Sequence, residues 1–125
     1  MFKISCFQIG CNDWDSLIDL LAADHVHGQL EGAVVYGLSA ALLEELTVKG
    51  GAIQQTNFID YPVLRMSDLP DIHTKIVTSD NPPTGMGEIG VVAVGPAIAN
   101  AVFQLTGKRL RNLPMSPERV KQALA

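Results

Sequence analysis

A carboxylate in a glycine-rich turn is the residue of this sequence best placed to do chemistry. Residues 83–90 read Pro-Thr-Gly-Met-Gly-Glu-Ile-Gly, and a long apolar segment follows them. Glycine has no Cβ, so Gly85 and Gly87 allow a tight turn and the close approach of another group. Glu88 on such a turn is a candidate general base if an apolar surround raises its pKa. The alternative is a first-turn glutamate that interacts with the free amides of a following helix.

Gln29 is the second candidate, because it stands at the start of a segment rich in small residues. Its side-chain amide donates and accepts hydrogen bonds at once, which suits the edge of a heterocycle. The alternative is a surface glutamine in the first turn of a helix. Both interpretations stay open on the sequence alone.

The histidines and cysteines do not predict a metal site. His25 and His27 are two residues apart without a third ligand, so we interpret them as solvated loop histidines. Cys6 and Cys11 are too few for a disulfide framework or a tetrahedral zinc site, and we expect buried free thiols. His73 alternates within a predicted strand and is expected to be exposed.

Length and composition predict one globular domain over residues 1–125. Apolar residues make up 47% of the chain and charged residues 18%. The net charge of −4 comes without a basic stripe, so nucleic acid is not an expected partner. The longest apolar stretch, residues 89–105, is interrupted by Gly, Pro and Asn and falls short of the roughly 20 residues of a membrane span. With no secretory signal recognised at its start, we expect a cytoplasmic protein.

Hydrophobic periodicity and turn residues predict alternating strands and helices. The expected strands are 2–9, 72–78 and 108–113, with a hairpin at 47–55 around Gly50 and Gly51. The expected helices are 14–21, 29–46 after a break at 25–28, 95–105 after a turn at 88–91, and one starting at Ser116 and Pro117; Thr106 and Gly107 would cap the third. We therefore predict an α+β (mixed α/β) fold, a small mixed sheet with two longer helices packed on it.

Two glycines inside the helix predicted over 29–46 need a reason. Gly32 and Gly37 each cost about 1 kcal/mol relative to alanine in a helix interior. We therefore expect a backbone or a ligand to pack closely against this face.

Six segments in this order resemble a known family. They are 28–32 (Gly-Gln-Leu-Glu-Gly), 36–42, 55–66, 85–88 (Gly-Met-Gly-Glu), 97–102 and 106–109. Together they resemble the C-terminal end of the large, molybdopterin-binding subunit of molybdenum hydroxylases, the xanthine dehydrogenase and aldehyde oxidase family. The isoquinoline 1-oxidoreductase β-subunit type is particularly similar. The resemblance covers residues 28–120, whereas residues 1–27 form a divergent N-terminal cap.

The resemblance implies an oxidoreductase that hydroxylates aldehydes or N-heterocycles with oxygen taken from water. In the family, the glutamate of the Gly-x-Gly-Glu motif is the base at the molybdenum site, and Glu88 occupies that position. The glutamine of the Gly-Gln-x-x-Gly motif contacts the molybdopterin cofactor, and Gln29 matches it. Gly87 of the same glutamate motif is the other implied cofactor-binding residue.

The family's subunit is several times longer than this chain, which suggests a fragment or detached domain. We expect it to be inactive alone, to hold no molybdopterin by itself, and to need the remaining hydroxylase subunits. The alternative is a stand-alone, non-enzymatic domain that kept the fold and buries its apolar faces in a homodimer. A small-ligand or protein interaction module using a pocket at Gln29 and Glu88 is a further possibility.

Overall fold

The computed structural model describes residues 23–76 and 87–125. In chain order the described elements are α2 (Ala23–Leu42), β1 (Val48–Lys49), β2 (Ala52–Ile53), the short 3-10 helix η1 (Met66–Asp68), α3 (Val91–Thr106) and α4 (Pro117–Leu124). The predicted α+β class is confirmed. The strand expected at 2–9, the helix expected at 14–21 and both cysteines lie outside the described residues.

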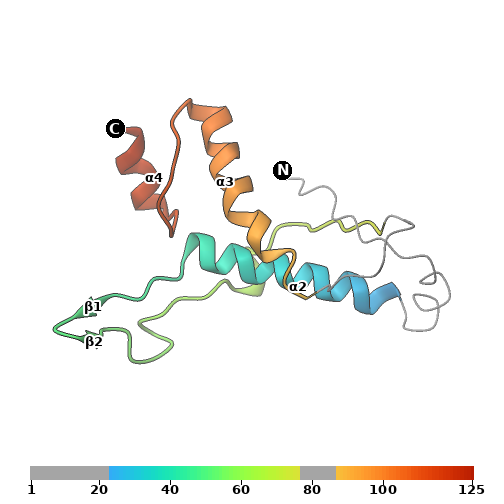
Figure 1. Ribbon diagram of the computed structural model, residues 1–125, viewed down its shortest axis with the longest axis horizontal. Coiled ribbons are helices and arrows are strands. Elements are labelled where there is room, and N and C mark those ends of the chain that lie inside the picture. The colour runs from blue at the N-terminus through green and yellow to red at the C-terminus, as the bar shows by residue number, and fades with distance from the viewer. Residues whose placement is uncertain (1–22, 77–86) are drawn as a thin grey trace.

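The long helix α2 is the base on which the other elements are arranged (Figure 1). The hairpin projects away from its C-terminal end, and α3 crosses it near the middle and rises from it. The two longer helices thus pack on each other. The sheet is a single antiparallel pair of two-residue strands. No helix in residues 23–76 or 87–125 is long and apolar enough to cross a membrane.

Helix α2 begins earlier and ends earlier than predicted. The expected break at 25–28 is wrong, because the helix already starts at Ala23. Val26, Leu30 and Val34 are buried at spacings of four, so the apolar stripe that faces the core extends back through the predicted break. At the other end, the amides of Leu43 and Glu44 both donate to the carbonyl of Ser39, at 3.0 and 3.2 Å, and the helix stops at Leu42.

Glycines allow α2 and α3 to touch at their crossing. A Cβ on Gly37 would lie 2.9 Å from Val94 Cγ2 and 3.0 Å from the carbonyl oxygen of Val91. A Cβ on Gly90 would lie 2.8 Å from that of Ala33. The prediction of close backbone packing is therefore confirmed at Gly37. At Gly32 no described atom lies within 4 Å of the position of a Cβ, so no described backbone packs there, and packing by a ligand stays a prediction.

The core consists of two small apolar clusters along one stripe of α2. The first contains Val26 and Leu30, with Ile76 and Ile89 packed against them. The second contains Val34, Leu38 and Val94, with Leu42, Leu64, Ile72 and Ile98 packed around them. Three segments that follow one another in the chain, α2, residues 64–76 and α3, therefore share one interior.

The hairpin prediction is confirmed. Gly50 and Gly51 have φ of 60° and 80°, the left-handed conformation that a two-residue hairpin turn requires. Val48 pairs with Ile53, and Lys49 with Ala52. We call residues 46–64, which include this hairpin and the irregular chain after it, the arm.

Two other predicted strands are wrong where the structure describes them. Residues 72–76 and 108–113 belong to no strand. A β-prone sequence forms a strand only where a second strand can pair with it, and the described chain brings none beside these segments. Residues 77 and 78 of the first prediction lie outside the described residues.

Helix α3 is longer than predicted, because it begins at Val91 instead of Gly95 and contains Pro96 in its interior. Its predicted C-terminal cap is confirmed, since Gly107 has φ of 71° and its N–H donates to the carbonyl of Phe103 at 2.7 Å. The predicted start of α4 is confirmed as well. Ser116 Oγ accepts a hydrogen bond from the N–H of Arg119 at 3.4 Å, and Pro117 is the first helical residue.

Candidate functional site

Gln29 lies on the exposed side of α2. It does not open the helix as predicted, because six helical residues, from Ala23 to Gly28, precede it. The next residue, Leu30, is only 1% exposed and belongs to the first apolar cluster. The helix thus fixes the position of the Gln29 backbone, while its amide remains accessible.

Glu88 lies in the exposed turn that leads into α3. The predicted turn at 88–91 is confirmed, because the N–H of Val91 donates to the carbonyl of Glu88 at 3.0 Å. Ile89 packs against the first apolar cluster, and Gly90 is buried against Ala33. The turn is therefore held by the two residues that follow the glutamate, and its carboxylate is left in solvent.

The structure brings the segments of Gln29 and Glu88 to the same apolar cluster. Leu30, which follows Gln29, is a member of that cluster, and Ile89, which follows Glu88, packs against it. Both candidate side chains are exposed beside it. A joint role of this amide and this carboxylate at one ligand stays a prediction.

Gly87 is exposed, and a Cβ built on it would meet no described atom within 4 Å. The described part of the fold therefore does not itself require glycine at this position. Open space at Gly87, next to an exposed carboxylate, fits the edge of a site that a larger group approaches. Gly85 and Met86 of the same motif lie outside the described residues.

The histidine predictions are partly wrong. His25 and His27 lie in α2 and not in a loop, and only His25 is fully exposed. His27 Nδ1 contacts the hydroxyl of Thr74 across to another segment. His73 is exposed as predicted. Among residues 23–76 and 87–125, no three His, Cys, Asp or Glu side chains gather to hold a metal ion.

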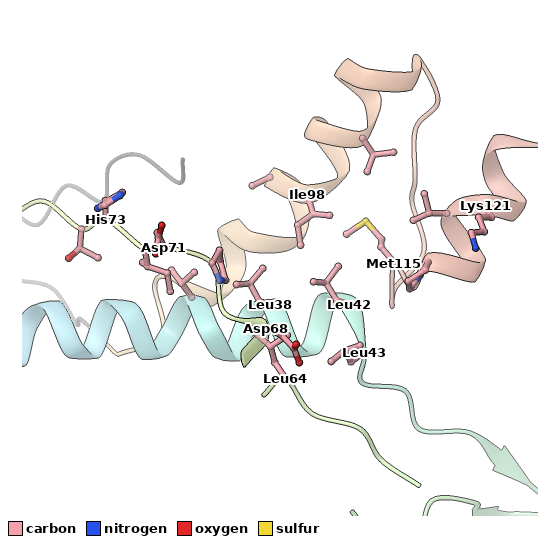
Figure 2. A pocket seen from close by; sticks show the side chains of 18 of the residues that line it. Leu38, Leu42, Leu43, Leu64, Asp68, Asp71, His73, Ile98, Met115 and Lys121 are labelled. Carbon is pink, nitrogen blue, oxygen red and sulfur yellow. The ribbon is translucent and has the colours of Figure 1, made fainter. Parts of the chain in front are cut away.

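A large apolar groove lies elsewhere on the molecule, with a cavity volume of about 1060 Å³. Figure 2 shows Leu38 and Leu42 of α2, Ile98 of α3 and Met115 directed toward the same space. Neither Gln29 nor Glu88 lines it. This groove is therefore a different site from the pocket at Gln29 and Glu88 that was predicted as one possibility, and that pocket stays a prediction.

Contacts from the C-terminal turns of α2 hold the walls of the groove. The buried Ser39 Oγ accepts from the N–H of Leu64 at 3.0 Å, and the carbonyl of Ala41 accepts from the N–H of Met115 at 2.7 Å. Glu45, just after the helix, forms an ion pair with Arg119 of α4. Sequence reasoning missed the groove because its lining comes from segments far apart in the chain.

A hydrogen bond from the Tyr61 hydroxyl to Glu44 Oε2, 2.7 Å long, ties the end of the arm to the same region. This bond is the main reason that the pKa of the Tyr61 phenol is raised above its ordinary value. The neutral phenol is the form that donates, so the bond is made at neutral pH.

The sequence and the fold of this chain are similar to those of known proteins. The family profile described as "Molybdopterin cofactor-binding domain" matches residues 20–70. The crystal structure of quinoline 2-oxidoreductase from Pseudomonas putida 86 superposes with a TM-score of 0.69 at 26% identity, over 82% of this chain and 14% of that chain. The chain belongs to the molybdenum hydroxylase family, in the region of its molybdopterin-binding subunit.

Two curated relatives show how similar this chain is to proteins of that family. Isoquinoline 1-oxidoreductase subunit beta of Brevundimonas diminuta is 48% identical over 94 residues, which are 75% of this chain and 12% of that protein. A membrane-bound aldehyde dehydrogenase of Gluconacetobacter polyoxogenes is 35% identical over 119 residues, 93% of this chain and 15% of that protein. The chain therefore spans about an eighth of the length of these relatives.

Proposed function

We propose that this chain is one part of a molybdenum-dependent hydroxylase of aldehydes or N-heterocycles. In this proposal a second chain supplies the rest of the molybdopterin-binding subunit, and neither part is active alone. The support comes from the relatives, which include proteins named as subunits and of which this chain covers 8% to 15%. We call the second chain the complementary chain.

The observation that carries the proposal is the shared position of Gln29 and Glu88. Both side chains are exposed, and each is followed by a residue of the same apolar cluster. The Gln29 amide would contact the pterin by donating and accepting hydrogen bonds. When bound, the cofactor supplies the molybdenum centre at which a substrate carbon is oxidised.

Glu88 would be the base that accepts a proton at a carboxylate oxygen during this reaction. Seating on the apolar cluster fixes the turn and thereby the carboxylate. Gly87 would leave room for the cofactor, because no described atom lies within 4 Å of the position of its missing Cβ. The described residues offer one edge of a site, and we propose that the chain retains the cofactor only within the complex.

The functional part in this proposal is residues 28–120, with residues 1–27 as a divergent cap within one domain of 125 residues. Helix α2 runs without a break through residues 27 and 28. A variant that begins at Ala23 keeps the whole helix and should therefore retain function.

The proposal is tested by complementation. The probe is the Brevundimonas diminuta β subunit cut before the region that matches this chain. Co-expression with the wild-type chain should yield a complex that contains molybdenum and pterin and oxidises an N-heterocycle. The Glu88→Gln variant should keep the cofactor and lose activity by at least about 100-fold, as expected for a missing general base. The Gln29→Ala variant should lower the cofactor content of the complex.

Two results would contradict this function. One is a complex without molybdenum or pterin under cofactor-replete growth. The other is full activity of the Glu88→Gln variant, which would remove the carboxylate from the reaction.

A stand-alone, non-enzymatic homodimer is the second candidate function. It is favoured by the apolar groove and by the exposed apolar side chains of the arm, above all Phe58 and Ile59. Burial against a second copy would cover such surfaces. Sedimentation should then give a dimer at micromolar concentration, and a strict monomer would exclude this candidate.

A further inference from the structure

Residues 71–76 have the side-chain pattern of a β-strand although they belong to none. Asp71, His73 and Lys75 are exposed, whereas Ile72, Thr74 and Ile76 are partly buried. This alternation with a period of two is the pattern of an extended chain with one face on a core. The sequence prediction of a strand was therefore right about the faces of this segment and wrong about its pairing.

The inner face of the segment is fixed against the helices. Ile72 packs on the cluster of Val34, Leu38 and Val94, and Ile76 packs on that of Val26 and Leu30. Between the two isoleucines, the Thr74 hydroxyl contacts His27 Nδ1 of α2. Three consecutive inward side chains thus hold the segment along α2.

Among residues 23–76 and 87–125, the backbone of this segment has no strand partner. Within the described part of the chain, no backbone hydrogen bond joins residues 71–76 to another segment. Backbone N–H and C=O groups that are extended and unpaired form an edge onto which another strand can add.

This segment is also one wall of the apolar groove. Residues 71–75 line it together with Ala97, Ile98 and Val102 of α3 and Val34 and Leu38 of α2. In Figure 2, Asp71 and His73 lie at one end of this space, and Met115 and Lys121 at the other. A strand that adds to the edge would direct every second side chain toward the apolar residues of the groove.

We propose that residues 71–76 are the docking strand for an extended segment of the complementary chain. The occupant has apolar side chains at alternate positions, which enter the groove. On its other face it has a basic residue beside Asp71 and an acidic residue beside Lys75, since opposite charges on paired strands attract. This inference rests on the proposed function, and the occupant follows from it, because the relatives continue for most of their length beyond the region shared with this chain.

The test measures binding of the same truncated β subunit to variants of the segment. Proline removes the backbone N–H at its position, and its ring blocks a neighbouring strand on that side. Because successive N–H groups of an extended chain point to opposite edges, proline at 73 blocks one edge and proline at 74 blocks the other. Either His73→Pro or Thr74→Pro should weaken binding by at least about tenfold, the effect of about 1.4 kcal/mol of lost pairing. His73→Ala changes the exposed side chain of His73 without touching the backbone and should bind within about twofold of the wild type.

Deuterium exchange gives a readout that a mere loss of folding would not imitate. In the free chain the amides of residues 71–76 should exchange rapidly, and binding of the truncated subunit should slow them at least about tenfold. The amides of α2 and α3 should stay protected in every variant, which shows that the proline chains are folded.

The outcomes separate this inference from the proposed function. If the wild type binds and both proline variants bind equally well, the docking strand is wrong and the proposed function stands. If the wild type does not bind, both are wrong. Slow amide exchange at residues 71–76 in the free chain would also overturn the inference. If that protection increases with protein concentration, a second copy of the chain is the occupant. If it is lost when residues 1–22 are removed, that segment is the occupant.

Discussion

The crossing of α2 and α3 and the arm are held in place by opposite means. At the crossing, Gly37 and Gly90 let two backbones touch around Val94, which is 0% exposed. In the arm, Phe58 and Ile59 are 87% and 90% exposed. The first region is stabilised by apolar burial, and the second region retains its shape without it.

Local hydrogen bonds replace burial in the arm. The Gln55 side chain accepts from the N–H of Thr47 at 2.8 Å and donates to its hydroxyl at 3.0 Å, which closes the base of the hairpin. Asn57 Oδ1 accepts from the N–H of Ile59 at 2.7 Å and shapes the turn that carries the exposed apolar pair. Phe58 and Ile59 are therefore exposed on a segment that keeps a defined backbone through local hydrogen bonds.

The largest effect should come from emptying the apolar core along α2, next to the crossing. Leu30→Ala removes a side chain that is 1% exposed, and it should destabilise the chain by roughly 2–4 kcal/mol in denaturant unfolding. The matched control is Ile59→Ala in the arm, which should change the unfolding free energy by no more than about 0.5 kcal/mol. Equal losses in both variants would erase the distinction between the two regions.

A smaller effect should follow from adding one methyl group to the crossing. Gly37→Ala places a Cβ 3.0 Å from the Val91 carbonyl, a backbone atom that cannot easily move away, and should cost about 1–3 kcal/mol. Gly32→Ala in the same helix meets open space among the described residues and should gain up to about 1 kcal/mol. Thermal unfolding of the two variants should therefore shift in opposite directions.

A substitution at the junction between the two regions should lower the free energy of unfolding by about 1 kcal/mol. Ser39→Ala removes the buried hydroxyl that accepts from Leu64 N–H, and it leaves that amide without its acceptor. Ser67→Ala removes an exposed hydroxyl a few residues further along and should be nearly neutral. Faster amide exchange at residue 64 in the first variant alone would locate the loss at the junction.

The smallest effect concerns pH at α4. Hydrogen bonds from its own backbone N–H and then from the Ser116 hydroxyl hold the pKa of the Glu118 carboxyl below its ordinary value of 4.5. A lowered pKa in the folded state means that this stabilisation is present above pH 4.5 and is lost as the pH falls through the folded value. The difference in melting temperature between wild type and Glu118→Gln should therefore be present at pH 7 and vanish in acid. A difference that persists unchanged in acid would refute this assignment.

The sequence predicted those features that depend on local backbone chemistry. The hairpin at Gly50 and Gly51, the cap at Gly107 and the start of α4 at Ser116 each need one residue type in one conformation, and each was predicted correctly. The turn at Glu88 belongs to the same group, because a hydrogen bond between residues 88 and 91 defines it.

Features that depend on distant partners were not predictable in the same way. Helix α2 extends back to Ala23 with an apolar stripe that includes Val26 and Leu30. The partners of this stripe, Ile76 and Ile89, lie far away in the sequence. A strand at residues 72–76 needs a second strand, which no local pattern supplies. The groove joins four parts of the chain, so its existence follows from the crossing and not from any motif. The roles of Gln29, Gly87 and Glu88 stay predictions.

Pro96 gives α3 two halves that need not move together. It lacks the N–H that would bind the carbonyl of Val92, so the helix bends more easily there than in an uninterrupted stretch. The half before it carries the Glu88 turn and is clamped on α2, whereas the half after it carries Ile98 and Val102 along the groove. We therefore expect a ligand that widens the groove to tilt the second half of α3 about Pro96, while the first half and the Glu88 turn stay packed on α2.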